Sequence, residues 1–473
     1  MMGTSVATST ATELTEALRA KEISSRELLA LYLDRIDRLD RVDRHGVNAV
    51  VTLDVERAEG SAAAADDALA RGDDLGPLHG LPVTIKDAIA TEGIRSTGGA
   101  VELTDHVPTE DAPAVARLKA AGAIVFGKTN LPRWCGDSQA FNEIFGTTNN
   151  PWSFAHVPGG SSGGSSGRSA AALAAGFTGA ELGTDIGGSV RAPAHCCGVY
   201  AHKPSYGVIP NLGYIDHVGG GTTRTDINTF GPMARSADDL DLLLSVLASP
   251  TPDDAPAWRV EMPVSTVDSL AGLRVATWFD DDVTPVDAEY LGLLRATADA
   301  LADAGARVEE VHPGGALRDQ IAVYQPLIAA AVSPSMPDDV AEKISRSHLQ
   351  WLRNDEARTA VRRDWAEWFA GYDVLLAPAW SAPAFEHDHS GTMIDRVVMV
   401  NGQPRNHFEL SWWLMVVNLT NHPAVMTPIG RTAAGLPVGM QVIAPYLHDR
   451  RAIRVAGLVS GIVGGYDVPP GFE

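Results

Sequence analysis

Apolar positions recur at helical spacing near the start of the chain. Leu29, Leu33 and Ile36 form an apolar stripe, and Ser24 opens a plausible capping box in front of it. A second helix, rich in alanine, is expected over residues 55–70. The pattern therefore predicts an N-terminal part built from helices.

The hydrophobic pattern then changes from helix to strand. Residues 82–85 are a short apolar, β-branched run that ends in Lys86, and residues 123–126 are a second run of this kind. The segment between them, residues 113–121, has a helical pattern. A strand–helix–strand unit of this type predicts a layered α/β fold.

Regular elements continue towards the C-terminus without a repeat or a long linker. Residues 211–231 have few apolar anchors and predict an exposed loop, a candidate pocket rim. One large domain over residues 1–473 is therefore expected. Helices are expected over 236–247, 287–304 and much of 318–370, and strands over 273–277, 307–311 and 374–377.

The charge and the cysteines narrow the class of protein. The net charge of −22 argues against nucleic acid or an anionic membrane as the main partner. The chain has three cysteines, Cys135, Cys196 and Cys197, and the last two are adjacent. This odd number and this spacing suggest neither a disulfide framework nor a zinc site. The chain start has no leader-like apolar stretch, and no run reaches the length of a membrane span. These features predict a soluble, cytoplasmic protein.

Residues 158–205 form the most unusual stretch. They begin with glycines and serines, continue with an apolar helix over 169–175, and reach a tight turn over 183–191, GTDIGGSVR. Glycine-rich turns allow several backbone N–H groups to converge. Two familiar chemistries fit poorly. Residues 122–129 match the spelling of a phosphate-binding loop, but the middle of the motif is the strand itself. Ser189 lacks the glycine two residues later that a nucleophile elbow requires.

A lysine base is the remaining candidate. Lys86 ends an apolar strand, where burial would lower its pKa and favour the neutral amine. A neutral amine can take a proton from one serine, which relays it from a second serine. The alternative for Lys86 is an exposed lysine that pairs with Asp87.

Several motifs occur in one order between residues 80 and 441, within a likeness that runs from about residue 10 to about residue 460. The first three are GLPVTIKD at 80–87, PGGSSGG at 158–164 and GTDIGGSVRAP at 183–193. Together they resemble the amidase signature family. The further stretches are GTTNNPW at 146–152, CGVYAHKP at 197–204, GPMARS at 231–236 and GLPVGMQ at 435–441.

The resemblance implies one large α/β domain whose mixed central β-sheet is covered by helices on both faces. Its parts would be N-terminal helices over about 10–75, a signature core over about 76–250 and a C-terminal part over about 270–465. The implied activity is amide hydrolysis through an acyl-enzyme, with no metal and no cofactor.

The resemblance also implies roles for individual residues. Lys86 would be the base and Ser189 the nucleophile. The backbone N–H groups of Ile186, Gly187, Gly188 and Ser189 would form the oxyanion hole. Asp185 and Arg191 are expected to hold the turn rather than touch the substrate.

The bridging serine has two candidates because the Gly-Gly-Ser-Ser unit occurs twice. Ser165 lies 24 residues before Ser189, the usual family spacing, and Ser161 lies 28 before it. Four extra helical residues would add roughly 6 Å between bridge and nucleophile, which favours Ser165. Ser161 stays open because its own flanking glycines match better, whereas Arg168 replaces a family glycine beyond Ser165.

The substrate is less specified than the chemistry. We expect an aryl or alkyl amide, with carbamate or ester cleavage as a side activity. The expected partners are a small-molecule amide and no nucleic acid or membrane, with the chain a monomer or homodimer. The alternatives are the amidase subunit of a tRNA-dependent amidotransferase and an inactive binding protein. The candidate pocket residues are Trp134, Cys135, Phe141, Trp412 and Trp413.

Overall fold

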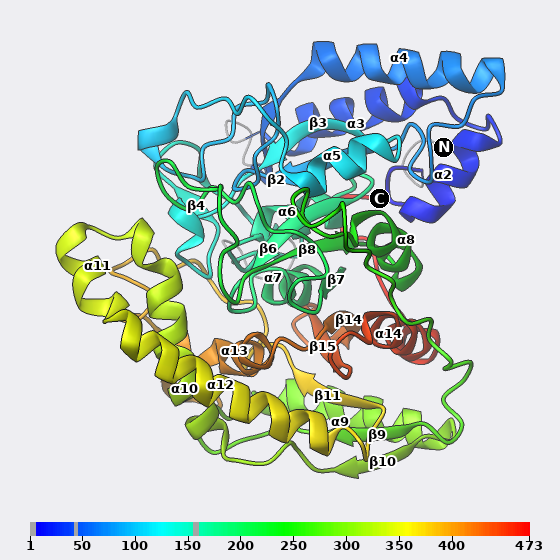
Figure 1. Ribbon diagram of the computed structural model, residues 1–473. Coiled ribbons are helices and arrows are strands. Elements are labelled where there is room, and N and C mark those ends of the chain that lie inside the picture. The colour runs from blue at the N-terminus through cyan, green and yellow to red at the C-terminus, as the bar shows by residue number, and fades with distance from the viewer. Residues whose placement is uncertain (1–5, 42–45, 155–159) are drawn as a thin grey trace.

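An 11-stranded mixed sheet runs through the centre of the molecule (Figure 1). This computed structural model describes residues 6–41, 46–154 and 160–473; Pro158 and Gly159 of the glycine- and serine-rich stretch lie outside them. The strand order is β1-β3-β2-β6-β8-β7-β14-β15-β11-β9-β10. The strands are β1 (Val50–Leu53), β2 (Pro82–Lys86), β3 (Ile124–Thr129), β6 (Glu181–Asp185), β7 (Tyr200–Lys203), β8 (Thr229–Ala234), β9 (Arg274–Thr277), β10 (Arg307–Glu310), β11 (Val374–Pro378), β14 (Ala424–Arg431) and β15 (Pro437–Ile443).

Helices flank this sheet, and two short hairpins lie outside it (Figure 1). The predicted α/β class with a mixed, helix-covered sheet is confirmed. The hairpins are β4 (Phe141–Asn142) with β5 (Gly146–Thr147), and β12 (Val397–Val400) with β13 (Gln403–Asn406). The helices are α2 (Ala11–Arg19), α3 (Ser25–Leu39), α4 (Val55–Arg71), α5 (Pro113–Ala120), α6 (Gly167–Ala174), α7 (Arg191–Cys197), α8 (Ala237–Leu247), α9 (Ala288–Asp303), α10 (Leu317–Val332), α11 (Asp338–Ser345), α12 (His348–Trp368), α13 (Trp412–Thr420) and α14 (Asp449–Val463).

The strand–helix–strand unit forms as the sequence predicts. β2 pairs with β3 in parallel, with α5 as the crossover, and β2 also pairs in parallel with β6. The carboxyl ends of parallel strands meet at one edge of a sheet, so the end of β2 and the turn after β6 lie at the same edge. Ser24 forms the predicted capping box of α3, with Glu27.

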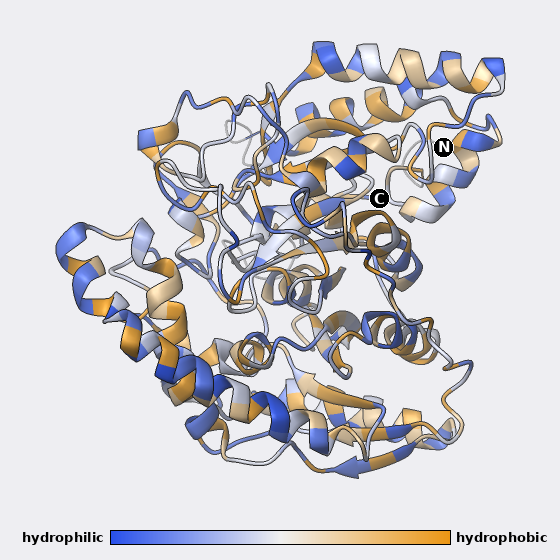
Figure 2. Ribbon diagram, in the orientation of Figure 1, coloured by the Kyte–Doolittle hydropathy of each residue, from blue (hydrophilic) through white to orange (hydrophobic). Residues whose placement is uncertain are grey.

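One sheet joins the middle of the chain to its end. β7 pairs with β14 through Ala424 and Lys203, so strands from the last 50 residues lie beside those of the core. Figure 2 shows apolar residues on strands such as β3 and β11, whereas β6 and β7 carry several polar residues and α12 on the outside is largely hydrophilic. The boundaries of the three sequence regions remain a prediction.

Two predicted segments differ from the structure. Residues 183–185 of the expected turn belong to strand β6, so the turn itself is shorter. The segment that precedes it is held by the hydrogen bonds between β6 and β8. The expected exposed loop over 211–231 ends in strand β8 and is partly buried, because Tyr214 and Ile215 enter the interior.

Candidate active site

Lys86 is the last residue of β2, and its side chain is fully buried. Its Nζ lies 2.7 Å from Ser165 Oγ and 2.8 Å from Thr184 Oγ1. Burial lowers the pKa of Lys86 because the ammonium group loses its water, although nearby Cys135 and Asp185 oppose this shift. A neutral amine in contact with a hydroxyl can accept the proton of that hydroxyl.

The two candidate bridging serines occupy different environments. Ser165 lies just before helix α6, and the peptide bond that precedes it is cis. Ser161 N–H donates to Phe385 O at 2.7 Å, which ties Ser161 to a different loop. The structure therefore brings Ser165 against Lys86.

Alanine substitution at the two serines should separate them. Ser165→Ala is expected to lower kcat roughly 100-fold, because the proton then needs a water to reach Lys86. Ser161→Ala is the matched control, since Ser161 is equally buried, and it should stay near the wild-type rate. Steady-state kinetics of both variants measure the effect. A larger loss in Ser161→Ala would move the bridging role to Ser161.

Ser189 lies in the turn between β6 and α7 and is partly exposed. Its carbonyl accepts a hydrogen bond from Ser166 N–H at 3.0 Å, which joins the two serine-bearing segments. Within the described residues, Ser189 Oγ forms no hydrogen bond, so the contact of Ser165 is with Lys86 and not with Ser189. Catalytic hydrogen bonds in enzymes without substrate are often long and shorten when the substrate binds.

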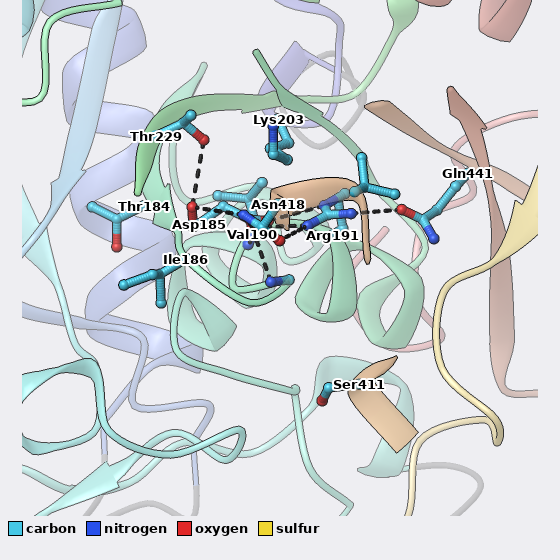
Figure 3. A network of polar contacts seen from close by, with 12 residues as sticks. Thr184, Asp185, Ile186, Val190, Arg191, Lys203, Thr229, Ser411, Asn418 and Gln441 are labelled. Carbon is cyan, nitrogen blue, oxygen red and sulfur yellow. Dashed lines mark hydrogen bonds and ion pairs between the residues drawn. The ribbon is translucent and has the colours of Figure 1, made fainter. Parts of the chain in front are cut away.

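A buried ion pair holds the turn that carries Ser189 (Figure 3). Arg191 donates to Asp185 through Nη2 at 2.9 Å and Nε at 3.1 Å, as expected for residues that hold the turn. Arg191 also donates to Asn418 Oδ1 at 2.6 Å and Gln441 Oε1 at 2.7 Å. Burial alone would raise the pKa of Asp185, but Arg191 and Asn418 hold that pKa below its usual range. The turn is thus fixed by charge-assisted bonds within itself and to two distant segments, α13 and β15.

The N–H groups of the turn divide into two sets. Gly188 N–H donates to Asp185 Oδ1 at 2.9 Å, and its role as an oxyanion donor stays a prediction. The N–H groups of Ile186, Gly187 and Ser189 make no hydrogen bond to any residue that the structure describes. These three groups remain the candidates for binding a negatively charged oxygen.

The predicted pocket residues before β5 have different environments. Cys135 is partly exposed, and its Sγ lies 4.0 Å from Thr184 Oγ1, next to the lysine. Trp134 is buried in a small apolar cluster. Phe141 stacks on His389 with ring centroids 3.9 Å apart. Of these three residues, Cys135 contacts the site directly.

The two tryptophans of α13 also differ from each other. Trp413 is 1% exposed, and its Nε1 donates to Thr284 O at 3.1 Å, so its surroundings are those of a core residue. Trp412 is partly exposed. Adjacent residues of a helix point about 100° apart, and one of the pair therefore faces the interior.

Sequence reasoning missed three residues around the turn: Thr184, Tyr324 and Asn418. Thr184 lies inside the GTDIGGS motif, which marks it locally, whereas no local pattern marks Tyr324 or Asn418. Across residues 6–41, 46–154 and 160–473, no cluster of three or more His, Cys, Asp or Glu side chains could hold a metal ion. None of the described helices has both the length and the apolar character needed to cross a membrane.

In this α/β fold, a lysine at the end of a central strand is buried against a serine from a glycine-rich segment. This arrangement is suited to amide C–N hydrolysis. The family model named Amidase matches residues 27–346 and 336–453, so the chain belongs to the amidase signature family. It is an enzyme that hydrolyses amide C–N bonds.

Solved structures and curated relatives are similar over nearly the whole chain. A bacterial aryl acylamidase of the amidase signature family has a TM-score of 0.83 and 26% identity, and 98% of each chain is covered. A second structure is similar with a TM-score of 0.83 and 27% identity, over 97% of this chain and 100% of that one. It is an inhibitor-bound vestigial protein complex that reveals the evolutionary origins of an s-triazine catabolic enzyme. The A subunit of glutamyl-tRNA(Gln) amidotransferase from Synechococcus sp. (strain CC9605) is 32% identical, over 93% of this chain and 94% of that protein.

These relatives correct one expectation from the sequence. The prediction of a monomer or homodimer that meets only a small-molecule amide and no nucleic acid is wrong. A second relative, from Deinococcus radiodurans, is 32% identical and is likewise the A subunit of a glutamyl-tRNA(Gln) amidotransferase. The net charge of one chain does not decide this question, because other subunits of an assembly can carry the contact with nucleic acid.

Proposed function

We propose that this amidase forms an acyl-enzyme on Ser189, with Ser165 as the proton relay and Lys86 as the base. The observation that carries the proposal is the fully buried Lys86 Nζ at 2.7 Å from Ser165 Oγ. Ser189 Oγ attacks the amide carbonyl, and its proton passes to Ser165 while the Ser165 proton passes to Lys86.

The same relay then runs in reverse. Lys86 returns the proton through Ser165 to the leaving nitrogen, because an amine departs far more easily than an amide anion. The negatively charged oxygen lies opposite the free N–H groups of Gly187 and Ser189 in the intermediate. Water, deprotonated through the relay, hydrolyses the ester on Ser189 and regenerates the enzyme.

For the substrate, the curated relatives favour the amide donor of an amidotransferase assembly, in which this chain is the amidase subunit. A second candidate is an aryl or alkyl amide, with carbamate or ester cleavage as a side activity. The likeness to an aryl acylamidase over 98% of each chain supports this candidate. Both use the same acyl-enzyme chemistry and differ in how the substrate is delivered.

Assays of the purified chain should separate the two substrates. We expect slow glutamine hydrolysis by the chain alone and a marked increase when the other subunits of a bacterial glutamyl-tRNA(Gln) amidotransferase and glutamyl-tRNA are added. Ammonia release and p-nitroacetanilide cleavage are measured side by side. Rapid anilide cleavage by the isolated chain, unchanged by those additions, would contradict the amidotransferase role and support the second candidate.

A further inference from the structure

Tyr324 connects helix α10 to the catalytic turn. Its side chain is fully buried, and its hydroxyl donates a hydrogen bond to Ile186 O at 2.7 Å. The two residues are 138 positions apart in the sequence. Helix α10 packs beside α13 (Figure 1), and Leu414 of α13 lies against Gly188 of the turn. The contact therefore ties the turn to a helix outside the signature motifs.

This hydrogen bond fixes the direction of one candidate oxyanion donor. Ile186 O and Gly187 N–H belong to the same planar peptide unit, and in a trans unit the two groups point in opposite directions. Holding Ile186 O therefore aims Gly187 N–H away from Tyr324. The next unit is fixed as well, because Gly188 N–H donates to Asp185.

The close approach also leaves little room for a side chain at position 187. A Cβ atom there would lie 3.1 Å from the Tyr324 hydroxyl oxygen and 3.5 Å from Met415 Cε. Burial raises the pKa of Tyr324 well above its usual value, so the hydroxyl keeps its proton and stays a donor at the pH values of an assay.

We propose that Tyr324 is a positioning residue for the oxyanion hole, and that it acts by orienting the Ile186–Gly187 peptide. The inference rests on the proposed function, because it assigns Gly187 N–H to the oxygen of the tetrahedral intermediate. Such a donor acts when the charge develops, so its alignment affects the transition state more than the bound substrate.

Tyr324→Phe tests the proposal because it removes only the hydroxyl. We expect kcat to fall about tenfold with KM little changed, since loss of a direct oxyanion donor costs roughly 100- to 1,000-fold and misalignment costs less. A trifluoromethyl ketone, which forms a tetrahedral oxyanion on Ser189, should lose affinity by a similar factor. The acid limb of the pH–rate profile should not move, because Lys86 is untouched.

Tyr466→Phe is the matched control. The Tyr466 hydroxyl also donates to one backbone carbonyl, Ala174 O at 2.9 Å, at the far end of α6. It should keep the wild-type kcat and ketone affinity. If Tyr324→Phe does not fold, Tyr324→Met serves as the second variant. It also lacks the hydroxyl, and its apolar side chain is smaller and more flexible.

The outcomes separate this inference from the proposed function. Wild-type kcat and ketone affinity in a folded Tyr324 variant, together with fluorophosphonate labelling of Ser189, would overturn the role of Tyr324 alone. A variant with altered kcat and KM and a lower melting temperature, but with wild-type ketone affinity, would also overturn it. That result indicates a purely structural role. Failure of Ser189 to label would instead remove the proposed function.

Discussion

Ser189→Ala is expected to lower turnover at least about 10,000-fold, because alanine has no oxygen to form the acyl ester. The fold should be preserved, since Ser189 is partly exposed and its hydroxyl makes no hydrogen bond within the described residues. The measurements are kcat on an amide substrate and the melting temperature of both proteins.

A covalent probe supplies the control for this prediction. A fluorophosphonate should add one phosphonyl group to the wild-type chain and none to Ser189→Ala, as read by intact mass. Substantial activity or labelling in the variant would remove Ser189 as the nucleophile.

Lys86→Met is expected to lower kcat roughly 1,000-fold, because methionine has a similar length but cannot accept a proton. The pH profile should change with it. In the wild type the active form holds neutral Lys86, and the rate falls as the pH drops through the lowered pKa of this group. In Lys86→Met the residual rate should lose that acid limb.

Lys128→Met is the matched control for the lysine. Lys128 lies opposite Ile85 on the neighbouring strand, is fully buried, and has a pKa lowered by burial to about 8. Its Nζ is bound by Ile89 O and Thr91 Oγ1. The acid limb should persist in Lys128→Met. Loss of the limb there, with the limb intact in Lys86→Met, would transfer the titration to Lys128.

The sequence predicts those parts of the site whose signals are local. An apolar strand that ends in Lys86 already indicates that this lysine is buried at the carboxyl end of a strand. The helical pattern after Ser165 sets its spacing to Ser189, and the structure brings Ser165 against Lys86. The parallel pairing of β2 and β3 follows from the same strand–helix–strand pattern.

The residues that brace Arg191 are held by long-range contacts. Asn418 and Gln441 lie 227 and 250 positions after Arg191, and the spacing of apolar residues carries no information about such contacts. The pocket prediction is limited in a similar way. Composition marks Trp412 and Trp413 alike, and the direction of the helix face makes Trp413 a core residue.

The residues that hold the catalytic turn are translated after the turn itself, and this order matters for synthesis on the ribosome. The three side chains proposed for the chemistry are all translated by residue 189. Asn418 and Gln441, which brace Arg191, lie 227 and 250 positions after it, and β14 must still pair with β7. A nascent chain therefore contains its reactive groups long before it contains the residues that align them. We therefore expect hydrolysis to begin only after Gln441 has been translated and β14 has paired with β7.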